Sequence, residues 1–111
     1  MIFVEDRDNF LISTDKSKLD IELIHNYLCN HSYWANGIAF DTVNRSIENA
    51  VCFGLYDNDR QVGFARVITD KATFGYLGDV FVLESHRGKG LSKWLMECVL
   101  KHPELQGFRR W

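Results

Sequence analysis

The sequence predicts an α+β domain, a mixed but mainly antiparallel sheet flanked by helices. Apolar residues recur at helical spacing in two segments, from Leu19 to Asn30 and from Leu91 to Lys101. Between these segments lie three strand-like runs separated by turn residues. A chain of 111 residues with 46% hydrophobic and 25% charged residues is large enough for one core and too short for two.

The N-terminal residues divide into an extension and the start of the domain. Residues 1–9 are charged and irregular, which predicts either a loose extension or a short added strand. The short apolar run from Phe10 to Ser13 predicts the first strand. We therefore place the domain at residues 10–111.

Two helices are expected next. Leu19, Leu23 and Tyr27 repeat at the spacing of one helical face. Ser17, followed by an acid three residues later, resembles a capping box at the start of this helix. A shorter helix is expected over residues 43–49.

The second half of the chain is predicted to form the central sheet and the last helix. AVCFGLYD, the turn letters DNDR and QVGFARVIT indicate an antiparallel hairpin. TFGYLGDVFVL is a third strand, in which Gly75 and Gly78 permit a bulge or a close backbone approach. The helix from Leu91 ends before Pro103, and ELQGFRRW begins another strand.

Composition excludes several classes of protein. A formal net charge of -2 argues against a nucleic-acid binder, which needs a basic surplus to neutralise phosphates. Cys29, Cys52 and Cys98 are odd in number and widely spaced, so neither a disulfide framework nor a metal site is indicated. The acidic N-terminus is unlike a secretory signal, and no apolar run approaches the ~20 residues of a membrane span. A cytoplasmic protein without a membrane partner is expected.

The turn HRGKG connects the third strand to the last helix and is a candidate anion site. First-turn amides of a helix lack intrahelical partners and lie at the positive end of the helix dipole. The amides of Gly88, Lys89, Gly90, Leu91 and Ser92 could therefore close around a pyrophosphate, with Arg87 and Lys89 as nearby cations. The alternative is an ordinary surface turn, in which His86 is a solvated residue.

The stretch DVFVLESHRGKGLSKWLMECVL resembles the acetyl-CoA-binding motif of the GNAT superfamily of N-acyltransferases. The motif has Arg or Gln, two residues, Gly, one residue, then Gly or Ala, which correspond here to Arg87, Gly90 and Ser92. Ser92 departs from the motif but is small. The order of strand, turn and helix also matches that of the family.

The resemblance implies roles for further residues. The pantetheine arm of acetyl-CoA would lie along the backbones of Val80 and Val82, where one amide stabilises the oxyanion. Asp79 is the candidate general base, whereas several relatives have their base nearer the position of Gly78. Tyr33 and Trp34 fall in the loop that covers the acceptor site in this family.

The expected function is acetyl-CoA-dependent transfer of an acetyl group to a primary amine of a small molecule or peptide. The rest of the family's fifth strand, which ELQGFRRW begins, and the tyrosine that often serves as general acid would lie beyond Trp111, so the domain is expected to be truncated at its C-terminus. A sheet edge left unpaired in this way would favour a homodimer. A noncatalytic acyl-CoA-binding or regulatory module, and a structural fragment, are the alternatives.

Overall fold

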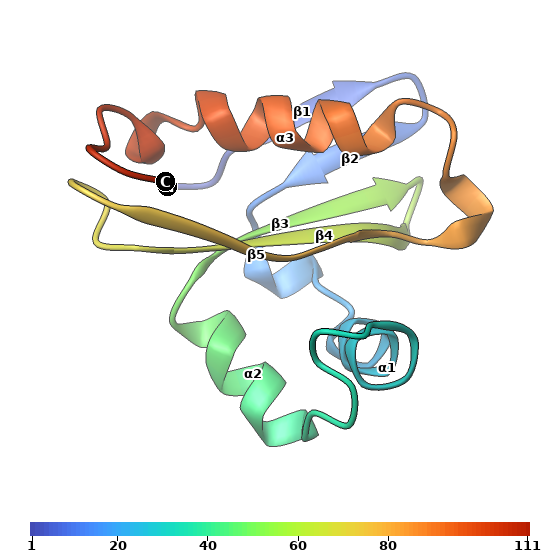
Figure 1. Cartoon of the computed structure of the whole chain (residues 1–111). Helices are drawn as coiled ribbons and strands as arrows, with labels where there is room; N and C mark the ends of the chain where they lie inside the picture. Colours follow the sequence, from blue (N-terminus) through green and yellow to red (C-terminus); the bar gives the residue numbers. More distant parts are fainter.

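The computed structural model describes all 111 residues and has the predicted α+β class. The chain forms five strands, three α-helices and three short 3-10 helices (Figure 1). In order they are β1 (Val4–Arg7), β2 (Phe10–Ser13), η1 (Lys16–Lys18), α1 (Ile21–His31), α2 (Phe40–Glu48), β3 (Val51–Asp57), β4 (Arg60–Thr69), β5 (Gly75–Val82), η2 (Glu84–His86), α3 (Leu91–Lys101) and η3 (Pro103–Leu105).

The sheet has the strand order β1-β2-β3-β4-β5, and every neighbouring pair is antiparallel. Strands that follow one another in sequence are thus neighbours in space; hairpins join all of them except β2 and β3, between which η1, α1 and α2 lie. Residues 1–9 contribute the short strand β1, the second of the two possibilities for that segment. At the opposite edge, β5 has a free side except near its start, where Phe74 and Arg110 form an isolated parallel bridge.

The C-terminal segment differs from its prediction. A strand was expected over residues 104–111, but the segment forms η3 and then only that single bridge. A Cβ atom added to Gly75 would lie only 2.9 Å from the ring of Phe108 and 2.9 Å from the ring of Trp111, so a larger residue would clash with them. The backbone of Arg110 also approaches this glycine, since its carbonyl accepts from the Gly75 amide at 3.1 Å.

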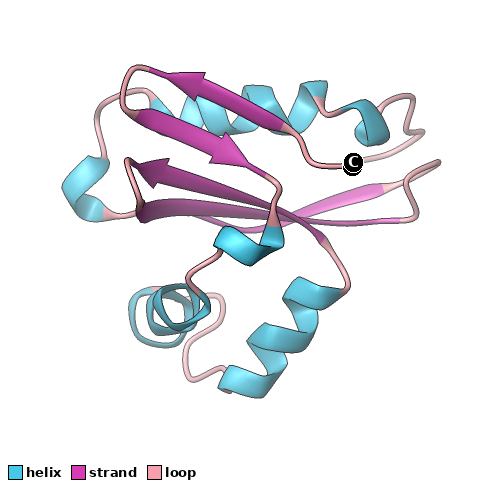
Figure 2. Cartoon of the chain, turned by 180° about the vertical axis from the view of Figure 1, so that it is seen from behind, coloured by secondary structure: helices cyan, strands magenta, loops and turns pink.

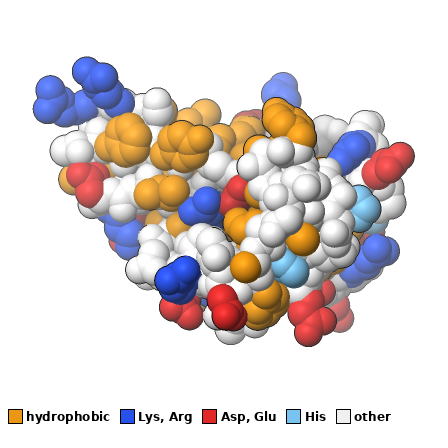
Figure 3. Space-filling model, turned by 60° about the horizontal axis from the view of Figure 1, so that its bottom comes forward, with side chains coloured by type: hydrophobic (Ala, Val, Ile, Leu, Met, Phe, Trp, Pro, Cys, Tyr) orange, Lys and Arg blue, Asp and Glu red, His pale blue; other side chains and the backbone are white.

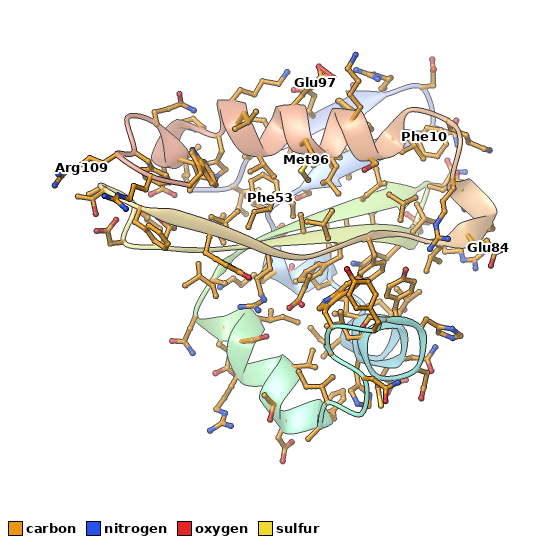
Figure 4. All side chains as sticks on the ribbon, in the orientation of Figure 1. Phe10, Phe53, Glu84, Met96, Glu97 and Arg109 are labelled. Carbon is orange, nitrogen blue, oxygen red and sulfur yellow. The ribbon has the colours of Figure 1, made fainter.

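Helices cover both faces of the sheet (Figure 1). Helix α3 packs on one face, where Phe53 and Met96 point into the layer between sheet and helix while Glu97 points away (Figure 4). Side chains alternate across a strand and repeat every three to four residues on a helix, so each element presents one apolar side. The core on this face contains Ile12, Phe53, Leu55, Val62, Ala65, Val67, Val82, Leu91, Trp94, Leu95, Cys98, Val99 and Leu105.

Helices α1 and α2 pack on the other face around a second, smaller core. Its buried members are Ile24, Leu28, Val43, Ile47, Cys52, Phe64 and Phe81. Helix α1 begins at Ile21 because the carboxylate of Asp20 accepts a hydrogen bond from the amide of Leu23 at 3.1 Å. Asp20, rather than Ser17, therefore caps the helix, and Ser17 belongs to η1.

The β1-β2 hairpin curls towards α3 (Figures 1 and 2). The indole Nε1 of Trp94 donates to Glu5 at 2.8 Å, and the guanidinium of Arg7 lies 4.7 Å from the centre of the indole ring. Both contacts connect β1 to α3, so the N-terminal strand forms part of the packing around this helix. None of the helices combines the length and the apolar character that a membrane span requires.

Candidate coenzyme and acceptor site

The turn between β5 and α3 exposes a run of six backbone amides without protein partners. The intramolecular hydrogen bonds of this region begin again only at Trp94, whose amide donates to the carbonyl of Gly90 at 3.2 Å. The amides from Gly88 to Lys93 donate to no protein oxygen. Arg87, by contrast, uses its amide to bond the carbonyl of Glu84 at 3.3 Å. The free nitrogens therefore start at Gly88.

The two glycines of this turn are required by backbone conformation. Gly88 has φ 79° and Gly90 has φ 75°, a region that residues with a Cβ rarely adopt. No protein atom lies within 4 Å of the positions where their Cβ atoms would stand. The space beside both backbones is thus open. A small pocket of about 150 Å³ lies here, lined by Val82, His86, Arg87, Gly88, Gly90, Leu91 and Ser92.

Arg87 fixes the turn to two other elements. Its Nε donates to the carbonyl of Val82 at 2.9 Å, and its Nη2 donates to the hydroxyl of Tyr27 on α1 at 2.9 Å. The motif arginine therefore holds the end of β5 and α1 together. Lys89 and Ser92 are exposed, whereas Leu91 is buried in the core under α3.

A hydrogen-bonded chain supports the turn from the other side. His86 contacts Asp57 through Nε2 at 2.8 Å and Ser85 through Nδ1 at 2.8 Å. His86 is buried, so the expectation of a solvated turn residue is wrong. The hydrogen bond from His86, together with one from Asn9, holds the pKa of the Asp57 carboxyl below its usual value. This chain joins the β3–β4 turn to the start of the glycine-rich turn.

Val80 and Val82 lie on the open edge of the sheet. The neighbouring residues turn towards β4: the amide of Leu83 donates to Val62, and the carbonyl of Phe81 faces Gly63. Because backbone groups alternate in direction along a regular antiparallel strand, those of Val82, and the carbonyl of Val80 next to Phe81, point the other way. No strand pairs with them there. Their side chains pack towards α3.

Asp79 occupies a bulge in β5. Phe64 pairs with Phe81 and Arg66 with Gly78, so Asp79 and Val80 together oppose the single residue Ala65. Asp79 has φ 55°, which is uncommon for a residue with a side chain. Its carboxylate accepts one bond from Arg66 Nε at 2.9 Å and another from Trp34 Nε1 at 3.0 Å. The bulge thus directs this carboxylate to the α1 and α2 face.

A cavity of about 410 Å³ opens beside the bulge. It is lined by Trp34, Arg66, Tyr76, Leu77, Gly78, Asp79 and Val80. Trp34 therefore reaches the cavity from the loop after α1. Tyr33 stacks edge-on against Trp34 but is 92% exposed and lies outside the lining. Figure 3 shows hydrophobic side chains gathered on this face of the molecule, with charged groups among them.

Most of the residues singled out from the sequence lie along one path. The free amides of the turn, the open edge at Val80 and Val82, and the carboxylate of Asp79 follow one another along β5 towards the cavity. Sequence reasoning missed Arg66, which reaches Asp79 from the neighbouring strand, and Tyr27, which bonds Arg87. No group of three His, Cys, Asp or Glu side chains is arranged to hold a metal ion.

The fold and the glycine-rich turn are those of an acetyltransferase, and comparison with known proteins leads to the same class. Residues 21–111 match the Acetyltransferase (GNAT) family, so the chain belongs to this family. A protein of Gibberella zeae named "putative acetyltransferase" is 31% identical over 121 residues, which cover 92% of this chain and 67% of that protein. The chain is therefore similar to about two thirds of this relative.

Two solved structures illustrate the likeness. A "putative acetyltransferase" of the GNAT family from Xanthomonas campestris pv. campestris has 55% sequence identity and a TM-score of 0.90, covering 91% of this chain and 71% of its own. A GNAT family acetyltransferase from Streptococcus pneumoniae has 19% identity and a TM-score of 0.63 over 100% of this chain and 75% of its own. The second supports the fold alone.

Proposed function

We propose that this acetyltransferase uses acetyl-CoA and transfers the acetyl group to a primary amine. The observation that carries the proposal is the row of six free amides from Gly88 to Lys93. Amides at a helix N-terminus bind anions through both their N–H groups and the helix dipole. The pyrophosphate of the coenzyme is an anion suited to such a row, and Lys89 adds an exposed positive charge beside it.

Several residues would hold the rest of the coenzyme. The carbonyl of Val80 and the amide of Val82 are available to an extended ligand because they face an edge without a strand. The carbonyl of Val82 already accepts from Arg87, so Arg87 acts mainly by positioning the turn. Gly88, Lys89, Gly90, Leu91 and Ser92 would contribute their amides.

The neutral amine would attack the carbonyl carbon of the acetyl-CoA thioester, so that a C–N bond forms, the C–S bond breaks, and coenzyme A leaves as a thiolate that takes a proton to become the free thiol. We expect a backbone amide at Val80 or Val82 to donate to the carbonyl oxygen, a contact whose removal costs ~3 kcal/mol of transition-state stabilisation in other acyl transfers. Asp79 would accept the amine proton, directly or through a water, since each of its oxygens keeps a lone pair beyond the bond it already accepts. Trp34 would contact the acceptor, a small-molecule or peptide amine, and Tyr33 would reach it only from outside the cavity, where its ring packs against Trp34.

Calorimetry with acetyl-CoA tests the first part of the proposal. We expect binding to the 111-residue chain, and stabilisation by ~2.7 kcal/mol at a ligand concentration 100 times the dissociation constant. S-acetylpantetheine, which lacks the pyrophosphate, is the matched control and should bind much more weakly. Equal binding of the two ligands would contradict the assignment of the turn.

Detection of free thiol with a panel of primary amines tests the transfer itself. Thiol release that depends on both the amine and acetyl-CoA, and falls strongly in Asp79→Asn, is the expected result.

A second candidate function, a noncatalytic acyl-CoA-binding module, is favoured by the two contacts that already hold the Asp79 carboxylate. Coenzyme binding without thiol release from any amine would support that second function.

The free edge of β5 also bears on assembly. An apolar groove of about 520 Å³ lies beside this edge, lined by Tyr76, Leu77, Met96, Val99, Leu100 and Trp111. We propose that a second copy of the chain covers it, because unpaired edges and apolar surfaces favour association. Sedimentation should then detect a dimer, and a monomer at high concentration would contradict it.

The three unpaired cysteines support a reducing, cytoplasmic location.

A further inference from the structure

The cavity beside Asp79 contains a positive charge that the proposed reaction does not use. Arg66 lies on β4, opposite Gly78 of β5, so its side chain and the space above Gly78 share one face of the sheet. Its Nε is bonded to Asp79, while its two terminal nitrogens have no hydrogen-bond partner in the protein. The side chain is only 16% exposed. The side chain is thus largely buried, while its terminal N–H groups stay accessible in the cavity that Arg66 lines.

Gly78 makes room for a ligand in front of this guanidinium. A Cβ at position 78 would lie 3.3 Å from the ring of Tyr76 and 3.9 Å from Nη2 of Arg66. The absence of a side chain therefore leaves a space bounded by an aromatic ring and a guanidinium. Trp34 forms another wall of the same cavity. A flat or apolar group of a ligand would fit between the aromatic walls, and an anionic group of the ligand would pair with the guanidinium.

The charges in the cavity are complementary to a zwitterion. Arg66 and Asp79 are 2.9 Å apart, and an α-amino acid carries its ammonium and carboxylate at a similarly short separation. The carboxylate of such a ligand would pair with the terminal nitrogens of Arg66, a planar geometry that guanidinium groups prefer. Its amino group would then lie beside Asp79 and Val80, where the proposed coenzyme track ends.

We propose that the acceptor is a primary amine that also carries a carboxylate, with an α-amino acid bearing an apolar or aromatic side chain as its simplest form. The proposal rests on the acetyl transfer proposed above and adds the substrate class. A polyamine fits less well, because Asp79, the one acid that lines the cavity, is already paired with Arg66. A simple amine would leave the terminal N–H groups of Arg66 bonded to water alone, whereas a carboxylate would give them a charged acceptor.

Binding to the chain saturated with coenzyme A tests the proposal without relying on turnover. Phenylalanine, phenylalaninamide, phenethylamine and spermidine are compared by calorimetry or ligand-observed NMR; the first three share the ring and amine and differ at the carboxylate. Phenylalanine should bind roughly 10- to 100-fold more tightly than its amide, the ratio expected for hydrogen bonds to a charged group. Equal binding of acid and amide, or tighter binding of spermidine, would overturn the proposal.

Substitutions assign the preference to one side chain. In Arg66→Gln the ratio between acid and amide should fall towards one, while acetyl-CoA affinity stays unchanged and shows that the chain is folded. Arg66→Lys keeps the charge beside Asp79 and should retain only part of the ratio. Arg45→Gln, an exposed arginine on α2, is the matched control and should leave the ratio intact. A preference that persists in Arg66→Gln would place the carboxylate elsewhere.

The two proposals fail in different ways. If phenylalanine binds with the expected preference but releases no thiol from acetyl-CoA, the transfer proposal fails and the ligand class stands. If phenethylamine is acetylated as efficiently as phenylalanine, the transfer stands and the ligand class is wrong.

Discussion

The guanidinium of Arg87 donates to the hydroxyl of Tyr27 at 2.9 Å, and this bond joins the glycine-rich turn to α1. The ring of Tyr27 stacks on Phe81 of β5, with 4.0 Å between the centroids. Helix α1, β5 and the turn are therefore held in one arrangement by a single tyrosine. Since a row of amides can bind an anion well only if the amides are already convergent, this contact bears on coenzyme affinity.

Tyr27→Phe should weaken acetyl-CoA binding. The change removes the hydroxyl that accepts from Arg87 and keeps the stacking on Phe81. Loss of a hydrogen bond to a charged group costs ~1.5–3 kcal/mol, of which we expect about half to appear as reduced affinity, or roughly 3- to 10-fold. Titration calorimetry with acetyl-CoA measures this loss of affinity. Tyr33→Phe, which removes an exposed hydroxyl without a protein partner, should leave the coenzyme affinity unchanged; equal affinities of both variants and the parent would contradict the role of Tyr27.

Gly90→Ala should lower both stability and coenzyme affinity. At φ 75° an alanine is strained by roughly 1–2 kcal/mol, and its methyl group would occupy the open space beside the free amides. Gly107→Ala is a matched control, because Gly107 has φ 73° and equally open surroundings away from the turn. Both variants should lose similar stability in urea unfolding, and only Gly90→Ala should lose affinity. Similar affinity loss in both would mean that strain alone is responsible.

Local patterns predicted the elements whose signals are continuous. Helix α3 begins at Leu91 and ends at Lys101 as expected, since a glycine and a proline bound its apolar repeat. The hairpin of β3 and β4 follows from alternating apolar residues around a polar turn. The predicted start of α1 was wrong, because Ser17 and Asp20 are both suitable capping residues and the structure uses Asp20, which directly precedes the helix.

Contacts between distant residues could not be predicted in this way. The motif singled out the amides of Gly88 to Ser92, and in the structure these amides and that of Lys93 donate to no protein oxygen; their binding of a pyrophosphate stays a prediction. Nothing in the sequence around Asp79 indicates that Arg66 and Trp34 hold its carboxylate, because that contact depends on a bulge and on a loop that crosses from α1. The burial of His86 likewise depends on Asp57 at the far end of the β3–β4 hairpin.

Tyr56→Phe should be neutral or stabilising. The hydroxyl of Tyr56 is buried and has no hydrogen-bond partner, and burial raises its pKa well above the usual value. An unpaired buried hydroxyl costs roughly 1–3 kcal/mol, so removing it should raise the free energy of unfolding by up to about 1 kcal/mol once lost packing is considered. Thermal and urea unfolding measure the change. A clear loss of stability would mean that the hydroxyl is bonded, for example through a water.

Stability should fall as the pH drops below about 6.5 because of His102. Its side chain is 1% exposed and packs against the rings of Phe3 and Phe53. Nδ1 accepts the amide of Glu104 at 3.0 Å, so the ring is neutral, and a proton on Nδ1 would break this bond. Burial lowers the pKa of His102 below its ordinary value of 6.5.

The sign of the effect follows from proton binding. Below pH 6.5 the unfolded chain protonates this histidine while the folded chain does not, so protons favour unfolding until the pH reaches the lowered pKa. The loss has a limit of about 1.4 kcal/mol per pH unit for one proton. Urea unfolding at pH 7.5, 6.5 and 5.5 measures it. His102→Asn, whose amide oxygen can accept from Glu104, should flatten this dependence, whereas exposed His31→Gln should not. An unchanged slope in His102→Asn would assign the dependence to another group.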